Sequence, residues 1–510
     1  MSMSRGLVFL VLLLICGAFF LQNIDAPFGT EGVPTELAVY CEVMSQAWDE
    51  VGFVESLGMP MLAPVGETVA ERRPYIHHPP AGFWPNHAGR ALLGKSEAGY
   101  RIFPILATLL TAVLLHLLVR PLAGTHMALL AALSFLALPF TQLYGAMPNS
   151  EPFTLLWAVL LLLARRFMTR RPSPMRAKLF FLVFLLGTQI DWQFYFMAPA
   201  LLLAEGATAP KERRWRPLLR LFPLGVLGFF LVIAHMLAAV GIPRLVFNQI
   251  KEAVLATQPA LARDLRGEEH LDFLSAQSEI FLRNFGSPGV VLLGVLLLVL
   301  VFSRRWRRDP LSGSTLTLVL GGLLTVVVFN RQAATHEYFW NLAAAGIPLV
   351  VVQAARILER ALLRLGLAAR GAAGIALLLP LVFAAWSFVS VQPRKAAFEK
   401  TGNAALAAGM DEIMDLRFRV PICITSPEAA LRPLMLYSRH RWAPPIFEPD
   451  DVLFVLREMD AGRAGFRRLV VLVAPASRAR WPRLFTFLEE ESRRRGIPPV
   501  PAGGVTAFIL

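Results

Sequence analysis

Long apolar runs, separated by polar segments, occupy most of the chain up to residue 391. Most of these runs approach the ~20 residues that an α-helix needs to cross the hydrocarbon core of a bilayer. The pattern therefore predicts a bundle of membrane-spanning helices. The predicted segments are Gly6–Leu21, Tyr100–Val119, His126–Tyr144, Pro152–Phe167, Leu179–Thr188, Trp192–Ala204, Leu218–Val240, Gly289–Phe302, Leu311–Phe329, Trp340–Ile357 and Ile375–Val391.

The pattern changes from Gln392 onward, where short apolar runs alternate with polar stretches of helical periodicity. This alternation is typical of a small α/β domain outside the membrane. The predicted fold is therefore an all-α polytopic membrane protein of about eleven transmembrane helices, residues 1–391, followed by an α/β domain, residues 392–510. The apolar runs are Val420–Thr425, Leu469–Val473 and Val505–Leu510, and the helical stretches are Asp450–Met459 and Arg483–Arg494.

Clusters of Arg and Lys between the apolar runs predict the orientation, because such clusters stay on the cytoplasmic side. They share that side only if Leu179–Ala204 runs out and back as a hairpin of two short arms that turns near Gln189-Ile190-Asp191. The N-terminus is then inside, Gly6–Leu21 is an uncleaved first helix, and the C-terminal domain is extracytoplasmic. The basic groups are Arg5, Arg165 to Lys178, Lys211 to Arg216, Arg304 to Arg308, and Arg356 to Arg370.

The composition agrees with a membrane protein, since 55% of the residues are hydrophobic and the net charge is +14. Mean hydropathy is +0.54. The positive-inside clusters account for the charge, so we expect no nucleic-acid partner. Cys16, Cys41 and Cys423 show neither metal-ligand spacing nor an even disulfide framework, and we expect no bridge between the last two.

The first outer loop, residues 23–99, is long and polar. Amphipathic periodicity predicts a helix over Pro34–Trp48, with Thr35 as its cap. The loop closes on His77-His78-Pro79-Pro80. Each proline fixes its own φ and extends the residue before it, so the two imidazoles are held on a stiff extended backbone.

The predicted topology places many ionisable residues at or just beyond the outer ends of the helices. Such groups are expensive near the membrane and are functional candidates by default. Singly, each could be a snorkelling or loop residue, and we favour that interpretation for Glu31 and Arg331. Together they suit chemistry in a cavity at the outer leaflet, with a carboxylate as base and imidazole or cationic groups to hold an anion. The candidates are Asp25, Glu31, Glu36, His77, His78, Arg101, Glu151, Asp191, Arg331, His336 and Glu337.

Several short motifs occur in a characteristic order between Arg5 and Arg360. This stretch resembles bacterial integral-membrane glycosyltransferases of the GT-C fold, and it is similar to glycosyltransferase family 39 and to the aminoarabinose and protein O-mannosyl transferases. Thr35-Glu36 stands where the family usually has an Asp-Glu pair. The motifs are Thr35-Glu36-Leu37-Ala38-Val39-Tyr40, His77-His78-Pro79-Pro80, Glu97 to Arg101, Pro148 to Glu151, Gly187 to Trp192, and His336-Glu337-Tyr338-Phe339-Trp340.

The resemblance implies a polyprenyl-phosphate-linked sugar as donor and a lipid, glycan or protein acceptor outside the bacterial inner membrane. A carboxylate would deprotonate the acceptor hydroxyl, which attacks the anomeric carbon with inversion. We favour Glu36 as this base, with Asp25 as the rival. His77, His78, Arg101 and Arg331 are the candidates to hold the leaving lipid phosphate. No cofactor is expected, and a divalent metal held by Asp25, His77 or His78 is the less favoured alternative.

Two other functions compete with glycosyl transfer. A transporter or flippase of a lipid-linked saccharide would typically show paired repeats and helices broken near the midplane. No repeat is evident, and the polar groups lie at the helix ends. A scaffold that binds a partner through its α/β domain would not need costly carboxylates there. We therefore favour the enzyme.

Overall fold

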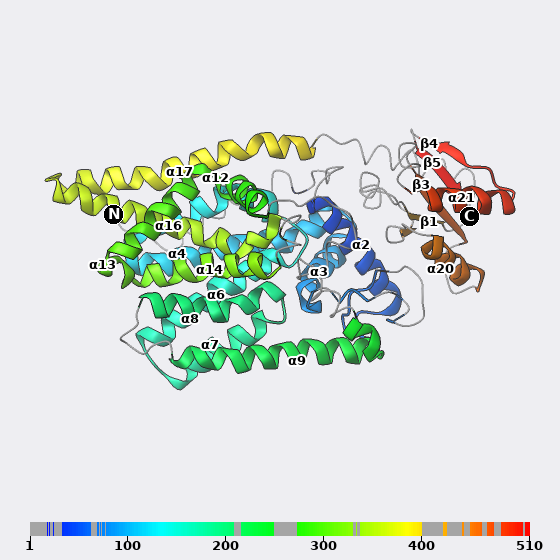
Figure 1. Cartoon of the computed structure of the whole chain (residues 1–510), viewed down its shortest axis with the longest axis horizontal. Coiled ribbons are helices and arrows are strands. Elements are labelled where there is room, and N and C mark those ends of the chain that lie inside the picture. Colours follow the sequence, from blue (N-terminus) through cyan, green and yellow to red (C-terminus); the bar gives the residue numbers. More distant parts are fainter. Residues whose placement is uncertain are drawn as a thin grey trace.

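The computed structural model describes most of the bundle and the elements of the C-terminal domain (Figure 1). The described residues are 18, 20, 24, 33–62, 69–70, 72, 74–76, 78–208, 216–248, 273–329, 333, 337–399, 422–425, 441–442, 449–461, 467–473, 481–502 and 505–510.

The bundle consists of helices that follow most of the predicted apolar runs, although α12 begins 16 residues before the run at Gly289. The main helices are α4 (Glu97–Ala137), α5 (Pro139–Tyr144), α6 (Glu151–Arg170), α7 (Pro174–Gly187), α8 (Met197–Thr208), α9 (Leu221–Val240), α12 (Phe273–Phe302), α13 (Arg304–Arg307), α14 (Pro310–Val328), α16 (Asn341–Arg364) and α17 (Ala369–Glu399). Short 3-10 turns connect them: η3 (Trp192–Phe196), η4 (Arg216–Arg220) and η5 (Glu337–Trp340).

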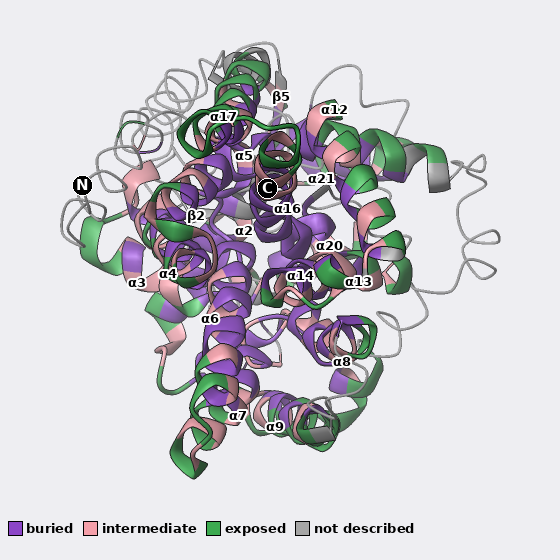
Figure 2. Cartoon of the chain, turned by 90° about the vertical axis from the view of Figure 1, so that its left-hand side faces the viewer, coloured by how far each residue is buried: buried purple, intermediate pink, exposed green. Residues whose placement is uncertain are grey.

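Among the described residues, seven helices are long and apolar enough to cross a membrane. The eleven predicted spans differ from these seven for three reasons. Helix α4 contains two of the predicted spans, the arms α7 and α8 are individually short, and Gly6–Leu21 lies almost wholly outside the described residues. The central helices α6, α14 and α16 are mostly buried, whereas α9 and α17 expose long apolar side chains, as lipid-facing helices do (Figure 2).

Helix α4 reverses direction at Gly124, whose φ of 84° and ψ of 170° are not helical. A positive φ of this size favours glycine, because a Cβ would crowd the backbone. Two contacts confirm the reversal. Thr108, well before Gly124, donates from Oγ1 to the carbonyl of Gly145, which follows α5, at 2.6 Å, so the two halves run side by side. Leu118, just before the turn, accepts a hydrogen bond from Arg166 Nη1 near the far end of α6.

The predicted hairpin is present. Ser150, before the start of α6, donates a hydrogen bond from Oγ to Asp191, which lies between α7 and α8. At the opposite end, Arg165 Nη2 of α6 lies 3.1 Å from Glu205 Oε1 of α8. The chain from α7 to α8 therefore runs the length of α6 and returns, with its turn at Asp191.

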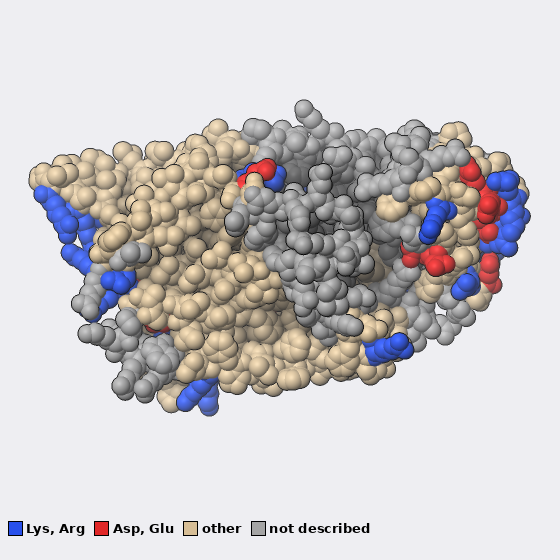
Figure 3. Space-filling view, in the orientation of Figure 1, with Lys and Arg blue, Asp and Glu red and all other residues tan. Residues whose placement is uncertain are grey.

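We name the two ends of the bundle after these contacts. The loop end holds Ser150 and Asp191, together with the first outer loop. The arginine end holds Arg165, Arg308 and Arg356. Figure 3 shows Lys and Arg at that end of the bundle, whereas the C-terminal domain at the other end of the molecule carries both Lys or Arg and Asp or Glu. The structure thus brings described members of the predicted basic clusters together, as positive-inside clustering requires.

The first outer loop packs as α2 (Val33–Val51), η2 (Pro80–Gly82) and α3 (Trp84–Leu93). The predicted helix over Pro34–Trp48 is confirmed. The predicted cap is wrong, because α2 begins two residues before Thr35 and takes that residue into its first turn. At Gly82 a Cβ would overlap the carbonyl oxygen of Ile190, so the loop lies directly against the hairpin turn.

The C-terminal domain contains a five-stranded sheet in the order β2-β1-β3-β5-β4. Strands β1 to β3 pair in parallel, whereas β5 pairs antiparallel with both β3 and β4. The predicted strands and helices of this region are confirmed where they are described. The elements are β1 (Ile422–Thr425), β2 (Arg441–Trp442), α20 (Pro449–Asp460), β3 (Arg468–Val473), α21 (Pro482–Arg494), β4 (Val500–Ala502) and β5 (Val505–Ile509).

Strand β3 is buried on both faces, with successive side chains on opposite sides. Leu469, Val471 and Val473 belong to a hydrophobic cluster with α20 and α21. Val470 and Leu472 belong to a different cluster, which also contains residues of α2 and of the end of α9. The sheet therefore lies at the loop end of the bundle, next to the first outer loop (Figure 1).

Candidate functional site at the loop end

The structure describes some of the predicted site residues and not others. His78, Arg101, Glu151 and Asp191 are described in full. The backbones of Glu36 and Glu337 lie in α2 and η5, and their side chains lie outside the described part of the chain. Asp25, Glu31, His77, Arg331 and His336 lie outside the described residues.

Three of the four described candidates converge at the loop end. His78 Nδ1 lies 3.6 Å from Asp191 Oδ2, and the same carboxylate accepts a hydrogen bond from Ser150 Oγ. Asp191 is 1% exposed, and its Oδ1 accepts from the backbone N–H of Gln193 at 2.9 Å, which caps η3. One buried carboxylate thus joins the first outer loop, the start of α6 and the hairpin turn.

Glu151 is the first residue of α6 and lies next to this junction. It is 1% exposed, and neither oxygen of its carboxylate has a hydrogen-bond partner among the described residues. A buried carboxylate without partners is costly. The helix N-terminus offsets part of that cost, because its partial positive charge favours an anion. This combination is typical of a functional group that receives its partner from a ligand.

Two further side chains beside Glu151 share this property. The amide groups of Asn149 and Gln193 are each 1% exposed and have no hydrogen-bond partner among the described residues. Buried polar atoms are rarely left unsatisfied, and those that are often mark a functional site. We call the group the loop-end cluster, and its members are His78, Asn149, Ser150, Glu151, Asp191 and Gln193.

Cys41 and Tyr75 bring the first outer loop against this cluster. Cys41 Sγ donates to Pro148 O at 2.8 Å, and the thiol is free rather than bridged, as the sequence predicts. Burial raises the pKa of the Cys41 thiol, and the nearby carboxylates of Glu151 and Glu42 raise it further. Burial likewise raises the pKa of Tyr75, with smaller contributions from Tyr40, Glu151 and Asp191. Both groups therefore stay neutral at physiological pH.

Arg101 has a different described contact. It lies near the start of α4, and its Nη1 donates to Ile24 O at 3.0 Å, which ties α4 to the chain that follows the first apolar run. Its predicted role as a phosphate ligand stays a prediction.

Sequence analysis missed a third buried carboxylate, which lies in the first outer loop. Glu42 of α2 is 0% exposed and accepts hydrogen bonds from Arg90 Nε at 2.8 Å and from Tyr100 Oη. Lys95 Nζ lies 3.5 Å away, and Arg90 Nη1 also donates to Asp49 Oδ2 at 2.6 Å. Burial alone would raise the pKa of Glu42, but the charges of Lys95 and Arg90 outweigh it and lower that pKa.

The Glu42 network fastens α2 to α3 and α4, since its partners come from both. Its charges are internally matched, unlike those of the loop-end cluster. We therefore assign it to holding the loop in place. The sequence offered no signal for it, because Arg90 and Tyr100 lie 48 and 58 residues away from Glu42.

Among the described residues, no group of three or more His, Cys, Asp and Glu side chains could hold a metal ion. The predicted metal alternative named Asp25, His77 or His78, and the structure does not describe the first two, so it stays a prediction.

The loop-end cluster falls within the part of the chain that matches a known family. Residues 77–246 match the family model described as dolichyl-phosphate-mannose-protein mannosyltransferase. A stretch of 163 residues is 29% identical to the undecaprenyl phosphate-α-4-amino-4-deoxy-L-arabinose arabinosyl transferase of Edwardsiella ictaluri strain 93-146. That match spans 31% of this chain and 29% of the length of the relative.

Solved structures match over nearly the whole chain. Crystal structures of ArnT from Cupriavidus metallidurans cover 99% of this chain at 12% identity. The TM-score is 0.65 for the form bound to undecaprenyl phosphate, of which 98% is covered, and 0.57 for the apo form, of which 97% is covered. The Archaeoglobus fulgidus oligosaccharyltransferase in complex with zinc and sulfate matches at a TM-score of 0.53 and 11% identity, over 94% of this chain and 69% of its own. The predicted fold is confirmed: this chain is a polytopic membrane protein with the GT-C fold of the ArnT structures.

Proposed function

We propose that the protein is a membrane glycosyltransferase that moves a sugar from a polyprenyl-phosphate-linked donor to an acceptor at the outer face of a bacterial inner membrane. The observation that carries the proposal is the loop-end cluster. The carboxylate of Glu151 and the amides of Asn149 and Gln193 are buried without a hydrogen-bond partner among the described residues, and all members of the cluster lie in the segment that matches the mannosyltransferase family model. The fold shared with an ArnT structure that holds undecaprenyl phosphate supports the lipid-phosphate donor.

In this proposal the loop-end cluster binds the sugar. Unpaired carboxylate and amide oxygens, as in Glu151 and Asn149, accept hydrogen bonds from hydroxyl groups, and the amide N–H groups donate. Asp191 lies beside His78, near the end of the first outer loop. In this proposal the imidazole of His78, when charged, faces the donor phosphate. A hydrogen bond between charged partners is shorter and stronger than a neutral one, so it suits a phosphate.

The catalytic base belongs to the first outer loop. Glu36 lies in the first turn of α2, where the positive end of the helix dipole favours the charged form that a base needs. Asp25 is the rival candidate. The base takes the proton of an acceptor hydroxyl, which then attacks the anomeric carbon with inversion while the lipid phosphate leaves.

The acceptor is a lipid, a glycan or a protein. The C-terminal domain lies at the loop end, where it could contact the acceptor. This requires the domain to be extracytoplasmic, as the basic clusters at the opposite end favour. The alternative of a flippase has less support, since most of the buried unpartnered polar groups among the described residues lie near helix ends, and those of the loop-end cluster all do.

The experiment uses the full chain in lipid nanodiscs with synthetic polyprenyl-phosphate sugars and isolated envelope lipids as acceptors. Release of polyprenyl phosphate and mass gain of the acceptor are measured together. We expect Glu151→Gln and Asp191→Asn to lose transfer. Glu279→Gln is the matched control, because that carboxylate is 73% exposed on α12. Sugar movement across vesicle membranes without bond cleavage would overturn the enzyme in favour of the flippase.

A further inference from the structure

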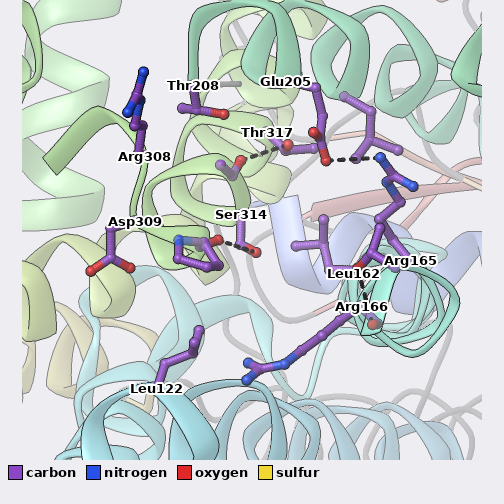
Figure 4. Close-up of a pocket in the computed structure, with 14 residues that line it drawn as sticks. Leu122, Leu162, Arg165, Arg166, Glu205, Thr208, Arg308, Asp309, Ser314 and Thr317 are labelled. Carbon is purple, nitrogen blue, oxygen red and sulfur yellow. Dashed lines mark hydrogen bonds and ion pairs between the residues drawn. The ribbon is translucent and has the colours of Figure 1, made fainter. Parts of the chain in front are cut away.

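A polar cavity lies at the arginine end, among α6, α8, α14 and the part of α4 that precedes Gly124 (Figure 4). Arg165, Arg166, Glu205, Arg308, Asp309 and Ser314 contribute to its lining. Helix α6 connects the two ends, and Glu151 and Arg166 are separated by about 22 Å at 1.5 Å per residue. A donor phosphate at the loop end therefore cannot reach this cavity.

Positive charge exceeds negative charge around the cavity. Arg165 Nη2 donates to Glu205 Oε1 at 3.1 Å. Arg356, outside the lining, lies with its Nη1 2.7 Å from Asp309 Oδ2. Glu205 and Asp309 are the only acidic residues in the lining that the structure describes. Arg165 pairs with Glu205, and Arg356 pairs with Asp309. The positive charges of Arg166 and Arg308 are therefore left in excess.

Arg166 is also short of acceptors. Its Nη1 donates to Leu118 O, which fixes the guanidinium against α4. Its Nη2 is buried and has no hydrogen-bond partner among the described residues. A buried donor without an acceptor costs free energy. General positive-inside clustering does not account for this arrangement, because such residues normally reach water or lipid headgroups with their charged ends.

We propose that this cavity binds a phosphate group, carried either by an anionic lipid of the adjacent leaflet or by free phosphate. A guanidinium presents a planar fork of donors that matches phosphate oxygens, and Arg308 adds a second cation. Ser314 and Thr317 place hydroxyl groups on one wall, whereas Leu122 and Leu162 make other walls apolar. The apolar walls suit the carbon chain beside a lipid phosphate.

Binding is measured on the purified full chain in two arms. Native mass spectrometry follows retention of dioleoyl phosphatidic acid against the zwitterionic dioleoyl phosphatidylcholine, and isothermal titration calorimetry follows inorganic phosphate. We expect Arg166→Gln to weaken binding about 10- to 100-fold, the usual effect of losing a charged hydrogen bond. Arg308→Gln should also weaken binding. Because Arg308 is exposed, this substitution should leave the fold intact.

Two further variants separate the cavity from nonspecific charge. Gly313→Leu should block the cavity without changing any charge. Among the described residues, a Cβ at Gly313 would meet Thr208 Oγ1 alone, at an ordinary contact distance of 3.5 Å, so the helix can accept the larger side chain. Arg176→Gln removes a partly exposed arginine of α7 that does not line the cavity, and it should have no effect.

Retention of phosphatidic acid alone assigns the site to a lipid, and heat from inorganic phosphate assigns it to the free ion. No binding in either arm would overturn the proposal. Equal losses in Arg166→Gln and Arg176→Gln would also overturn it, because nonspecific charge would then explain the result. Sugar transfer is not part of the measurement, so this outcome is independent of the proposed enzyme.

Discussion

The Nδ1 atom of His78 lies 3.6 Å from Oδ2 of Asp191, although 113 residues separate them in the chain. The first outer loop and the hairpin turn thus meet at one buried carboxylate. Because Asp191 also accepts from Ser150, a substitution at any of the three changes the surroundings of the other two. The consequences are testable one group at a time.

The catalytic base is tested by amide substitution in the first outer loop. Loss of a positioned base typically lowers the rate by about 10²–10⁴. We expect Glu36→Gln to lose turnover on this scale with little change in donor affinity, and Glu31→Gln to be mild. Turnover and donor binding are measured on the same preparations. Normal turnover in Glu36→Gln with loss in Asp25→Asn would move the role to Asp25. Normal activity in both would remove the carboxylate mechanism.

The histidines are tested as donor ligands. Replacing His77 and His78 together with Ala should weaken binding of polyprenyl phosphate, while the protein stays folded and inserted. Gln at both positions should restore part of the affinity, because its amide still donates a hydrogen bond. His126→Ala serves as control, since that residue is exposed on α4. Unchanged affinity in the double Ala variant would reduce both histidines to loop packing.

The Glu42 network predicts a pH-dependent stability. Because the pKa of Glu42 is lowered below its usual value of 4.5 in the folded protein, its contribution is fully present above that value. The contribution is lost as pH falls through the folded pKa. Thermal unfolding in detergent should therefore show a Tm that drops in acid.

The same network gives a mutational test. Breaking one side of a buried ion pair typically costs about 3–5 kcal/mol. We expect Glu42→Gln to lower Tm at pH 7 and to flatten its acid dependence. Glu55→Gln is the matched control, because that side chain is exposed. An acid dependence that survives in Glu42→Gln would assign the effect to other carboxylates.

Orientation is tested by reporter fusion. Helix α17 continues to Glu399, beyond the predicted end of the bundle at Val391, so the fusion is placed after Glu399. An alkaline phosphatase joined there should be active and a fluorescent protein dark. The reverse result would put the loop-end cluster on the cytoplasmic side and remove the proposed site.

The helices of the bundle could be predicted, because a helix that crosses a membrane needs a long run of apolar residues. The hairpin turn at Asp191 followed from charge clustering alone, since only that turn keeps the arginines at one end. The Glu42 network was not predictable, because its partners are distant in sequence and form ordinary surface-like patterns. Thr35 lies inside the first turn of α2 rather than at its cap, because helix starts depend on tertiary packing as well as on the capping residue.

Strand β3 has no free face, and this restricts how the protein can change over evolutionary time. Val470 and Leu472 are buried in the cluster that contains Ala38 and Met44 of α2. A larger side chain on β3 has to be matched by a smaller one in α2, and the reverse also holds. Substitutions in the sheet and in the first outer loop are therefore expected to be coupled. Grafting a foreign C-terminal domain onto this bundle would mismatch the surface that backs the loop.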